Sequence, residues 1–347
     1  MLGCKDYSAI TLNLIPMFRR IRTDMPDTEA KNIAVKEPER ELIVYGPFHS
    51  TFFDILRSFR RRYPEYDINL TYYGAHPGPT ISRIEQEVKN GMQTADIVMQ
   101  PHYAILHLKE AGYLKRYSSD LLDAYPAQFR DEDNQWAGIA IEPTRTVYNP
   151  NIIEPDDVPS SWADLADPKL KGKIAMQSVV DRTDGLYSFY YFATLLEIFG
   201  ERKWERVMKD FTHNVKPKSF PCYHNLHKYI ARGDYGIGLP LPLIKVGWSV
   251  NTVNMEDVPN LAMQRSIAML KNAQHPNAAK LFYNYLLSED WQRKMGTEFE
   301  GLIPARPNTK MKYGAQFDIE KIRFFPTEEN VRKMSTYEEK FHQVGLP

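Results

Sequence analysis

Two segments of the chain each combine hydroxyl side chains with a histidine or an arginine directly before a predicted helix. His49-Ser50-Thr51 precedes one apolar pattern with helical spacing, and Asp181-Arg182-Thr183-Asp184-Gly185 precedes another. The first N–H groups of a helix have no partner within it, and at exposed sites they favour a bound anion by about 0.3 to 1 kcal/mol. Both segments therefore predict contacts to an oxyanion.

Arg182 could strengthen the second of these sites. A guanidinium group matches the geometry of phosphate, sulfonate and carboxylate groups, so that Arg182 could close on such a group together with Ser178 and Thr183. The pattern also fits a simpler alternative, in which Thr183 or Asp184 only caps the helix and Arg182 is solvated.

Flat side chains near the predicted loops could form the walls of a pocket for an organic ligand. On one predicted helix, the spacing assigns Tyr190 and Tyr191 to the core, whereas Tyr187 in the first turn is kept as a ligand contact. Glu142 and Arg145 either contact the ligand or pair with each other near a strand that links two lobes. The aromatic candidates are Phe48, His102, Tyr103, Tyr187 and Tyr223.

The run Cys222-Tyr223-His224-Asn225-Leu226-His227 combines thiol and imidazole groups, which are good zinc ligands. The sequence places no fourth ligand beside them. We therefore expect no metal site and no other cofactor, and we assign Tyr223 and His224 to a loop that lines the ligand site.

The common signatures of enzymes are missing from the chain. It contains no Gly-x-Ser-x-Gly elbow, no Gly-Lys-Ser/Thr phosphate loop and no His-Glu-x-x-His helix. We therefore expect no catalytic activity. An enzyme that acts on an anionic metabolite through the same scaffold stays open as an alternative, because a fold does not fix a function.

Length and charge narrow the choice of partners. The chain has 347 residues, more than one ordinary core of about 100 to 200 residues, and its 44 basic side chains balance 44 acidic ones. Because no net field attracts phosphates, we expect no nucleic acid partner. No stretch reaches the roughly 20 apolar residues that span a bilayer. The apolar residues 9–18 are followed, rather than preceded, by Arg19 and Arg20, the wrong charge order for a secretory signal.

Short apolar runs bounded by Gly and Pro alternate with helical patterns in the first part of the chain. Strands are predicted at residues 42–45, 68–73 and 96–100, and Thr80 is predicted to cap the helix that ends near Lys89. This alternation predicts a mainly parallel sheet with its ligand site in the loops beyond the carboxyl ends of the strands. The loops that should share that edge are residues 46–50, 74–80 and 100–103.

A long strand at residues 138–148 is predicted to leave the first lobe and enter a second one. The second α/β pattern has strands at 173–177 and 235–239 and helices at 185–199, 201–210 and 225–232, and the chain returns through 261–270 to a helix at 276–287. The predicted parts are an extension at 1–40, a first lobe of 41–143 plus about 262–303, and a second lobe of 144–261 plus about 304–347. Two lobes joined by crossing strands predict a hinge that closes on a ligand.

Three segments carry a resemblance to a known family. They are Ser161-Trp162-Ala163-Asp164-Leu165 continuing through Asp167-Pro168-Lys169-Leu170-Lys171-Gly172, then His275-Pro276-Asn277-Ala278-Ala279 with Gly301-Leu302-Ile303-Pro304 behind it, and Ala95-Asp96-Ile97-Val98. Together they resemble the type II periplasmic solute-binding proteins of ABC transporters, in the branch related to ferric-iron-binding proteins. The resemblance covers the chain from about Glu41 onwards and implies an α/β fold of two lobes, a hinge and an interlobe ligand cleft.

The resemblance also implies where the ligand residues lie. His49 matches the histidine of the iron-binding members, but Leu241 stands in the segment where their paired tyrosines are expected, and His102 follows Gln100-Pro101 in place of their loop carboxylate. Fe(III) prefers phenolate and carboxylate oxygens, so this departure favours an organic ligand. The expected ligand residues are Phe48, His49, Ser50, His102, Tyr103, Glu142, Ser178, Arg182, Thr183, Tyr187, Tyr223, His224 and Leu241.

The resemblance predicts a monomeric receptor in the periplasm or outside the cell that delivers a small polar, anionic organic ligand to an ABC permease in the membrane. Ferric-iron capture with substituted ligands, through His49, Tyr223 and a bound anion, stays open as a second alternative.

Overall fold

The computed structural model describes residues 10–14, 37–47, 50–180, 186–221, 223–242, 249–298, 302–311 and 321–347, with the backbone alone for 10–14, 50–52, 223 and 224. The chain divides into two compact units. Unit 1 comprises Met1–Ile141, Gln264–Phe299 and Ile303–Tyr313, and unit 2 comprises Glu142–Met263, Glu300–Leu302 and Gly314–Pro347. Within the described part of the chain, no helix has the length and apolar character needed to cross a membrane.

Unit 1 is built on a sheet whose central strands are parallel. β2 (Glu41–Gly46) pairs in parallel with β3 (Asn69–Gly74) on one side and with β4 (Ile97–Pro101) on the other. β11 (Asn260–Leu270) runs antiparallel to β4 and also pairs with the short β5 (Leu114–Lys115). These strands confirm the alternation that the sequence predicts for this part of the chain.

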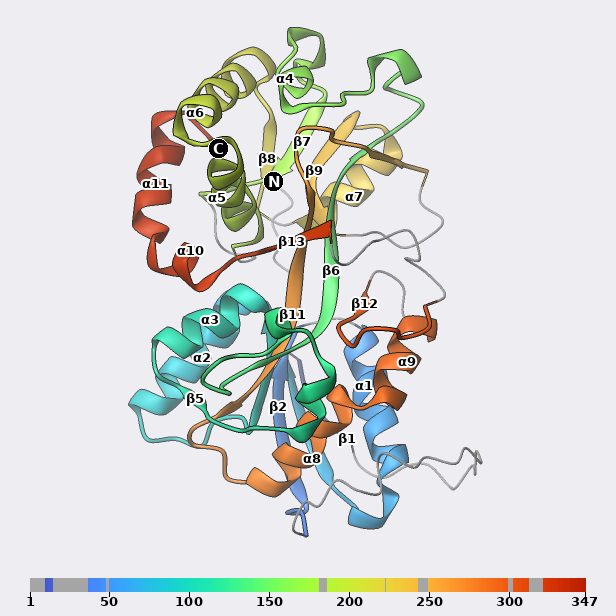
Figure 1. Cartoon of the computed structure of the whole chain (residues 1–347), viewed down its shortest axis with the longest axis vertical. Helices are drawn as coiled ribbons and strands as arrows, with labels where there is room; N and C mark the ends of the chain where they lie inside the picture. The colour runs from blue at the N-terminus through green and yellow to red at the C-terminus, as the bar shows by residue number, and fades with distance from the viewer. Residues whose placement is uncertain are drawn as a thin grey trace. The chain divides into compact units, whose positions relative to one another are not determined.

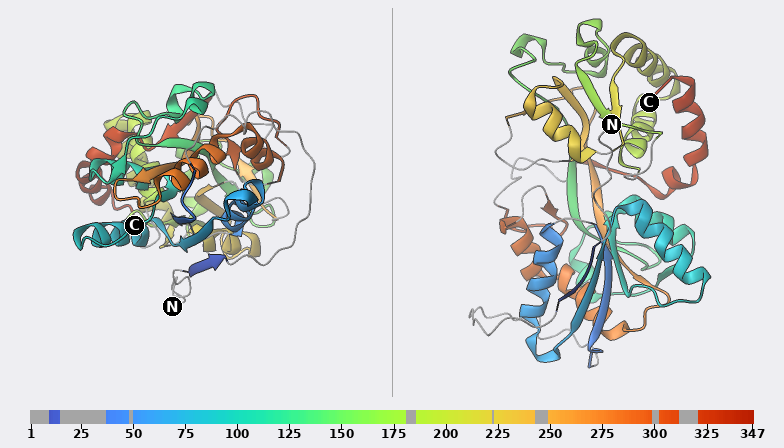
Figure 2. Two further views of the ribbon diagram at one scale, coloured as in Figure 1. Left: turned by 90° about the horizontal axis from the view of Figure 1, so that it is seen from below. Right: turned by 180° about the vertical axis from the view of Figure 1, so that it is seen from behind.

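Helices cover both faces of this sheet (Figures 1 and 2). α2 (Pro77–Lys89) and α3 (His102–Glu110) lie on one face, and α1 (Ser50–Arg62), α8 (Pro276–Leu287) and α9 (Glu289–Glu298) lie on the other. Aromatic rings join the second group: Phe59 of α1 meets Phe282 of α8 with centroids 4.9 Å apart, and Tyr285 of α8 lies 5.4 Å from Trp291 of α9. Burial of these large rings stabilises that face of unit 1.

Two segments differ from the predicted division of the chain. β1 (Ile10–Leu14), which lies in the predicted extension, pairs antiparallel with β3. Residues 304–313 belong to unit 1 rather than to the predicted second lobe, because β12 (Ile303–Pro304) pairs with Ile141 and Ala140 of β6 (Ala137–Tyr148). Both placements result from strand pairing with residues far away in the sequence, which a local sequence pattern does not predict.

Unit 2 has a second, smaller sheet. β7 (Ile174–Gln177) pairs in parallel with β8 (Lys218–Phe220) and β9 (Ile237–Pro242), and β9 pairs antiparallel with the second half of β6. β10 (Asn251–Val253) is a further antiparallel partner of β6, and β13 (Ile322–Phe325) pairs in parallel with the first residues of β11. β6 and β11 are thus the strands that belong to both units.

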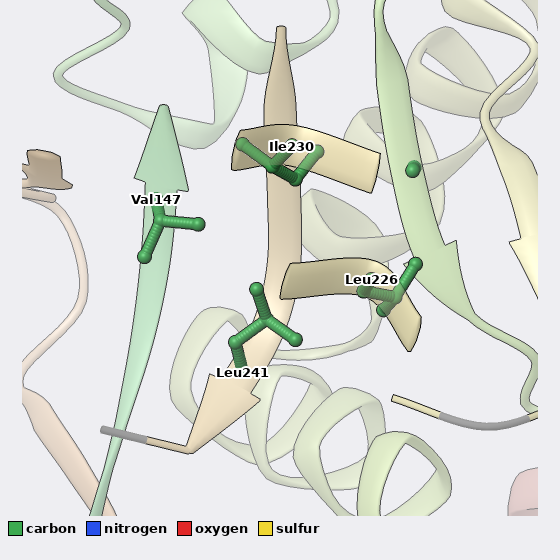
Figure 3. Packing of buried hydrophobic residues seen from close by; sticks show 5 residues of the cluster. Val147, Leu226, Ile230 and Leu241 are labelled. Carbon is green, nitrogen blue, oxygen red and sulfur yellow. The ribbon is translucent and has the colours of Figure 1, made fainter. Parts of the chain in front are cut away.

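Helices also cover both faces of the second sheet (Figures 1 and 2). α7 (Tyr223–Arg232) lies on one face, and α5 (Tyr187–Phe199), α6 (Glu201–Asp210) and α11 (Met334–Gln343) lie on the other. The short helices α4 (Trp162–Leu165) and α10 (Glu328–Arg332) complete the unit. Under α7, Leu226 and Ile230 pack against Val147 of β6 and Leu241 of β9 (Figure 3).

Candidate functional site

The carboxyl ends of three strands share one edge of the sheet in unit 1. Gly46 of β2 lies opposite Gly74 of β3 in the parallel register, and β4 continues on the other side of β2 to Pro101. The loops that follow these strands therefore leave from the same edge, as predicted. Phe48 and His49, which follow β2, lie outside the described residues, and Ser50 is the first residue of α1.

The buried Tyr72 of β3 contacts the residue that follows β2 at this edge. Its hydroxyl donates a hydrogen bond of 2.7 Å to the carbonyl of Pro47, and burial raises the pKa of Tyr72, an effect that Arg265 of β11 opposes. Tyr72 therefore stays protonated and keeps its donor. A Cβ atom at Gly46 would lie 2.6 Å from the Tyr72 hydroxyl, so only glycine fits this approach without a shift.

The prediction that Thr80 caps a helix is wrong. α2 begins at Pro77, three residues earlier, with His76 as its N-cap, because proline at the first position has its backbone angle preset for a helix. The Thr80 hydroxyl instead donates to the His76 carbonyl (2.9 Å) and accepts a bond from Gln100 Nε2 (2.9 Å). Since Pro77 and Pro79 have no N–H group, this helix start offers few donors to an anion.

His102 and Tyr103 begin α3 and are both buried. The Nδ1 atom of His102 lies 2.9 Å from the Ser266 hydroxyl, and its ring meets Trp136 edge-on at 4.4 Å. Burial lowers the pKa of His102 to about 3, with a smaller contribution from Lys109. His102 is therefore a neutral imidazole at physiological pH and not a cationic ligand for an anion.

The carboxyl ends of β7 and β8 form a comparable edge in unit 2. Gln177 of β7 lies opposite Phe220 of β8 in the parallel register, and the helices that follow these strands, α5 and α7, begin just beyond that edge. Tyr223 and His224 are the first residues of α7, so the prediction that they belong to a loop is wrong. Arg182 and Thr183 lie outside the described residues.

The first turn of α5 contains Ser188, whose backbone and side-chain polar groups indicate a ligand site. The backbone N–H of Ser188 donates to Gln177 Oε1 at 3.3 Å, and Gln177 Nε2 donates to the Pro221 carbonyl at the same distance. The Ser188 hydroxyl is buried and has no hydrogen-bond partner among the described residues. A buried hydroxyl without a partner costs free energy, and a bound acceptor would remove that cost.

Tyr187 and Ser178 flank this turn. The Tyr187 hydroxyl lies 2.6 Å from Thr144 Oγ1 of β6, and Tyr187 is almost fully buried. Ser178 Oγ accepts a bond of 3.1 Å from the N–H of Val180. Both side chains lie at the same edge as Ser188 and already take part in hydrogen bonds; their role as ligand contacts stays a prediction.

β6 contributes a partly desolvated cation to unit 2. Arg145 donates from Nη1 to the Thr144 carbonyl at 3.0 Å, and burial lowers its pKa to about 10 although Tyr187 opposes the shift. Arg145 therefore remains charged at neutral pH. Glu142, three residues earlier, is buried.

One residue predicted for the site lies in the core instead, and two residues of the site were not predicted from the sequence. Leu241 lies in the core under α7 with none of its surface exposed, because the alternation along β9 turns it inward. Ser188 was missed, although a serine in the first turn after a Gly-containing loop is a signal that the sequence offers. Gln177 was missed because no local pattern shows which strand residue meets a helix start.

The described residues contain no group of three or more His, Cys, Asp and Glu side chains arranged to hold a metal ion. His49 and Tyr223, on which the ferric-iron alternative depends, have no described side chains.

Comparison with known proteins gives matches in sequence and in structure. A family model described as bacterial extracellular solute-binding protein matches residues 92–234. The putative 2-aminoethylphosphonate-binding periplasmic protein of Salmonella typhi is 23% identical over 252 residues, which cover 69% of this chain and 70% of that protein.

Two solved structures show a similar course of the chain. The ferric binding protein from Campylobacter jejuni superposes with a TM-score of 0.73 at 20% identity, covering 88% of this chain and 100% of that one. The periplasmic binding protein AfuA from Actinobacillus pleuropneumoniae, with exogenous fructose-6-phosphate bound, gives a TM-score of 0.68 at 20% identity and covers 88% and 97% of the two chains.

Proposed function

We propose that this chain, a relative of the bacterial extracellular solute-binding proteins with the type II periplasmic binding-protein fold, binds a small organic anion for import and performs no catalytic step. One protein of similar structure is described as the substrate binding protein of the ABC transporter from Agrobacterium tumefaciens.

The observation that carries the anion is the start of α5. This helix has thirteen residues, so its N-terminus is the positive end of a helix dipole, and the buried Ser188 hydroxyl adds a donor that no described residue uses. Arg145 supplies a partly desolvated positive charge in the same unit. Donors and positive charge, with no set of metal ligands among the described residues, favour an oxyanion over a cation.

Arg182 and Thr183 are proposed as further contacts, since they directly precede the same helix in the sequence. Arg182 would bind two oxygens of one phosphoryl, phosphonyl or carboxylate group through its planar donors. The contacts proposed from unit 1 are those of the loops after β2, β3 and β4, with His49, Ser50 and Tyr103 as the candidates.

The relatives suggest the class of anion. One is named for 2-aminoethylphosphonate, and the structure of another contains fructose-6-phosphate. Both molecules present a tetrahedral phosphorus oxyanion on a small polar body, which fits a helix start with hydroxyl donors. We therefore propose an organic phosphonate or phosphate ester as the ligand, an ABC permease as the membrane partner, and a place in the periplasm or outside the cell.

A thermal-shift screen of the purified protein tests this function. The compounds are 2-aminoethylphosphonate, fructose-6-phosphate, inorganic phosphate, a carboxylate set and Fe(III). A ligand that binds only the folded state stabilises it by about 2.7 kcal/mol at a hundredfold excess over its Kd, so a binding compound gives a clear shift. The reaction mixture is then analysed for products, because turnover would contradict a receptor role.

Arg182→Ala sharpens the test. We expect the variant to bind the active compound at least about tenfold more weakly, because one bidentate charge-assisted contact of about 1.5 to 3 kcal/mol is lost. Its melting temperature without ligand should stay close to that of the wild type. Arg202→Ala, on the exposed surface of α6, is the matched control and should leave the affinity unchanged. Equal affinities for the two variants would remove Arg182 from the site, and a shift by Fe(III) alone would overturn the organic-anion assignment.

A further inference from the structure

The chain turns sharply after α11 through a well-defined helix ending. Val344 is the C-cap and Gly345 follows it with a φ of +69°. The N–H of Gly345 donates to the His342 carbonyl and the N–H of Leu346 donates to the Phe341 carbonyl, both at 3.1 Å. These two bonds define a Schellman motif, in which glycine supplies the left-handed residue.

The residues after this turn are fixed against the rest of unit 2. The hydroxyl of Thr212 donates to the Val344 carbonyl at 2.7 Å, and the side chains of Val344 and Leu346 are buried. Figure 1 shows the C-terminus beside α5. Backbone bonds, a side-chain bond and apolar burial thus hold one short tail, residues 344–347, in a single place.

The tail contacts the segment that directly follows β7, residues 178–180. The carbonyl of Pro347 accepts a hydrogen bond of 2.8 Å from the N–H of Val179. On either side, the N–H of Ser178 donates to the Phe220 carbonyl at 2.8 Å, and the N–H of Val180 donates to Ser178 Oγ at 3.1 Å. These three consecutive N–H groups therefore bond to three different parts of unit 2: strand β8, the tail, and the hydroxyl of Ser178.

Of the three anchors, the one at Val179 comes from the most distant part of the sequence. The bond at Ser178 extends the pairing of β7 with β8, and the bond at Val180 is local to the turn. Val180 exposes 52% of its surface, whereas the Val179 side chain exposes only 2% and is therefore also held by burial. The tail therefore adds a backbone hydrogen bond from outside the sheet at Val179, beside the burial of the Val179 side chain.

We infer that the tail positions the described start of the ligand-binding segment of unit 2: Leu346 and Pro347 hold Val179 and so fix its neighbours Ser178 and Val180. This inference rests on the proposed function, since Ser178 and the start of α5 are its ligand contacts. Leu346 and Pro347 are positioning residues and do not touch the ligand. Loosening them would increase the motion of the segment, and part of the binding free energy would then be spent on ordering it.

Gly345→Ala and Gly172→Ala form a matched pair of test variants. Gly345 and Gly172 both have φ near +70° (+69° and +74°), and a Cβ atom would meet nothing closer than 4.0 Å at either position. Alanine therefore introduces the same kind of backbone strain at both sites. Gly172 precedes the opposite end of β7, away from Val179, whereas Gly345 orients the tail. Leu346→Ala, which removes buried apolar contact, is the second tail variant.

Two measurements are made on the full chain. Amide hydrogen exchange at Val179 and Val180 reports on the segment without any ligand, and titration with 2-aminoethylphosphonate and inorganic phosphate reports on binding. For the tail variants, we expect exchange at Val179 to rise at least roughly fivefold above that of Gly172→Ala, the ratio given by losing one hydrogen bond of ordinary strength. We expect the affinity to fall by a similar factor.

The outcomes separate the inference from the proposed function. Unchanged exchange at Val179 in both tail variants would overturn the inference, and so would increased exchange with an unchanged affinity. Failure of the wild type to bind either probe would count against the proposed function and against the ligand role of the segment. The exchange data would then still decide whether the tail holds Val179.

Discussion

Ser188 shows at the scale of one residue how a buried polar group can mark a ligand site. Its hydroxyl has no partner among the described residues, so the ligand-free protein carries a desolvation cost there. We expect Ser188→Ala to leave the melting temperature equal or slightly higher, because this cost disappears, and to weaken binding of 2-aminoethylphosphonate or phosphate roughly fivefold. Calorimetric titration and thermal unfolding measure the two effects.

Thr194→Val in the same helix is the control for Ser188→Ala. The Thr194 hydroxyl donates to the Tyr190 carbonyl at 2.8 Å, and valine has nearly the same shape. This variant should lose about 1 kcal/mol of stability and keep its affinity, the reverse of the result for Ser188. A Ser188→Ala protein that loses stability and keeps full affinity would show that the hydroxyl has a structural role.

His102 gives a prediction for the dependence of stability on pH. The unfolded chain binds a proton at this side chain below the ordinary histidine pKa of about 6.5, whereas folded His102 stays neutral down to a pKa of about 3. Its contribution to stability is therefore complete above pH 6.5 and is lost as the pH falls from 6.5 towards 3, by up to about 1.4 kcal/mol per pH unit.

Urea unfolding between pH 7 and pH 4.5 measures this effect. We expect His102→Gln to show a shallower loss of stability with falling pH than the wild type, because glutamine does not titrate. His342→Gln, at an exposed position of α11, leaves His102 in place and should keep the wild-type slope. Parallel slopes for wild type and His102→Gln would mean that His102 is protonated in the folded state.

At the scale of the element, α8 depends on a residue that precedes the first parallel strand. The carboxylate of Glu39 accepts bonds of 2.9 Å from the backbone N–H groups of Asn277 and Ala278, and one of 3.1 Å from Asn277 Nδ2. A carboxylate at this place satisfies two of the free donors of the helix and complements its positive end. The fold of unit 1 therefore begins before Glu41, the start that the sequence predicts.

Glu39→Gln should destabilise the protein by about 1 kcal/mol, since the charge at the helix start is lost while much of the shape is kept. Glu37→Gln, at an exposed position in the same segment, is the control and should change stability by less than about 0.5 kcal/mol. Urea unfolding at low and high salt measures both. The difference should shrink at high salt, and a difference of zero at low salt would contradict the capping role.

At the scale of the whole molecule, each unit has a core of its own. Leu241 packs with Leu226, Ile230 and Val147, all residues of unit 2 (Figure 3). Leu241→Ala should cost about 2 to 5 kcal/mol through lost burial and a cavity. Hydrogen exchange should then increase at the amides of β7, β9 and α7 and stay unchanged at those of β2, β3 and β4.

Leu241→Met is the volume-conserving control and should cost less than about 1.5 kcal/mol. If exchange increased equally in both units, the two cores would unfold together and the division would have no thermodynamic meaning. If Leu241→Ala kept full stability and lost ligand affinity, Leu241 would contact the ligand, as the sequence suggested.

The sequence by itself determined the order and type of most elements, because hydrophobic periodicity and Gly/Pro punctuation are local. It predicts α8 at residues 276–287 and α6 at 201–210 with the bounds found in the structure. Tertiary structure alone decided what depends on residues far apart in the chain. The burial of the Ser188 hydroxyl and the contact of Pro347 with Val179 are of this kind. Each of these is set by the free energy of packing and pairing between distant segments, which no local pattern records.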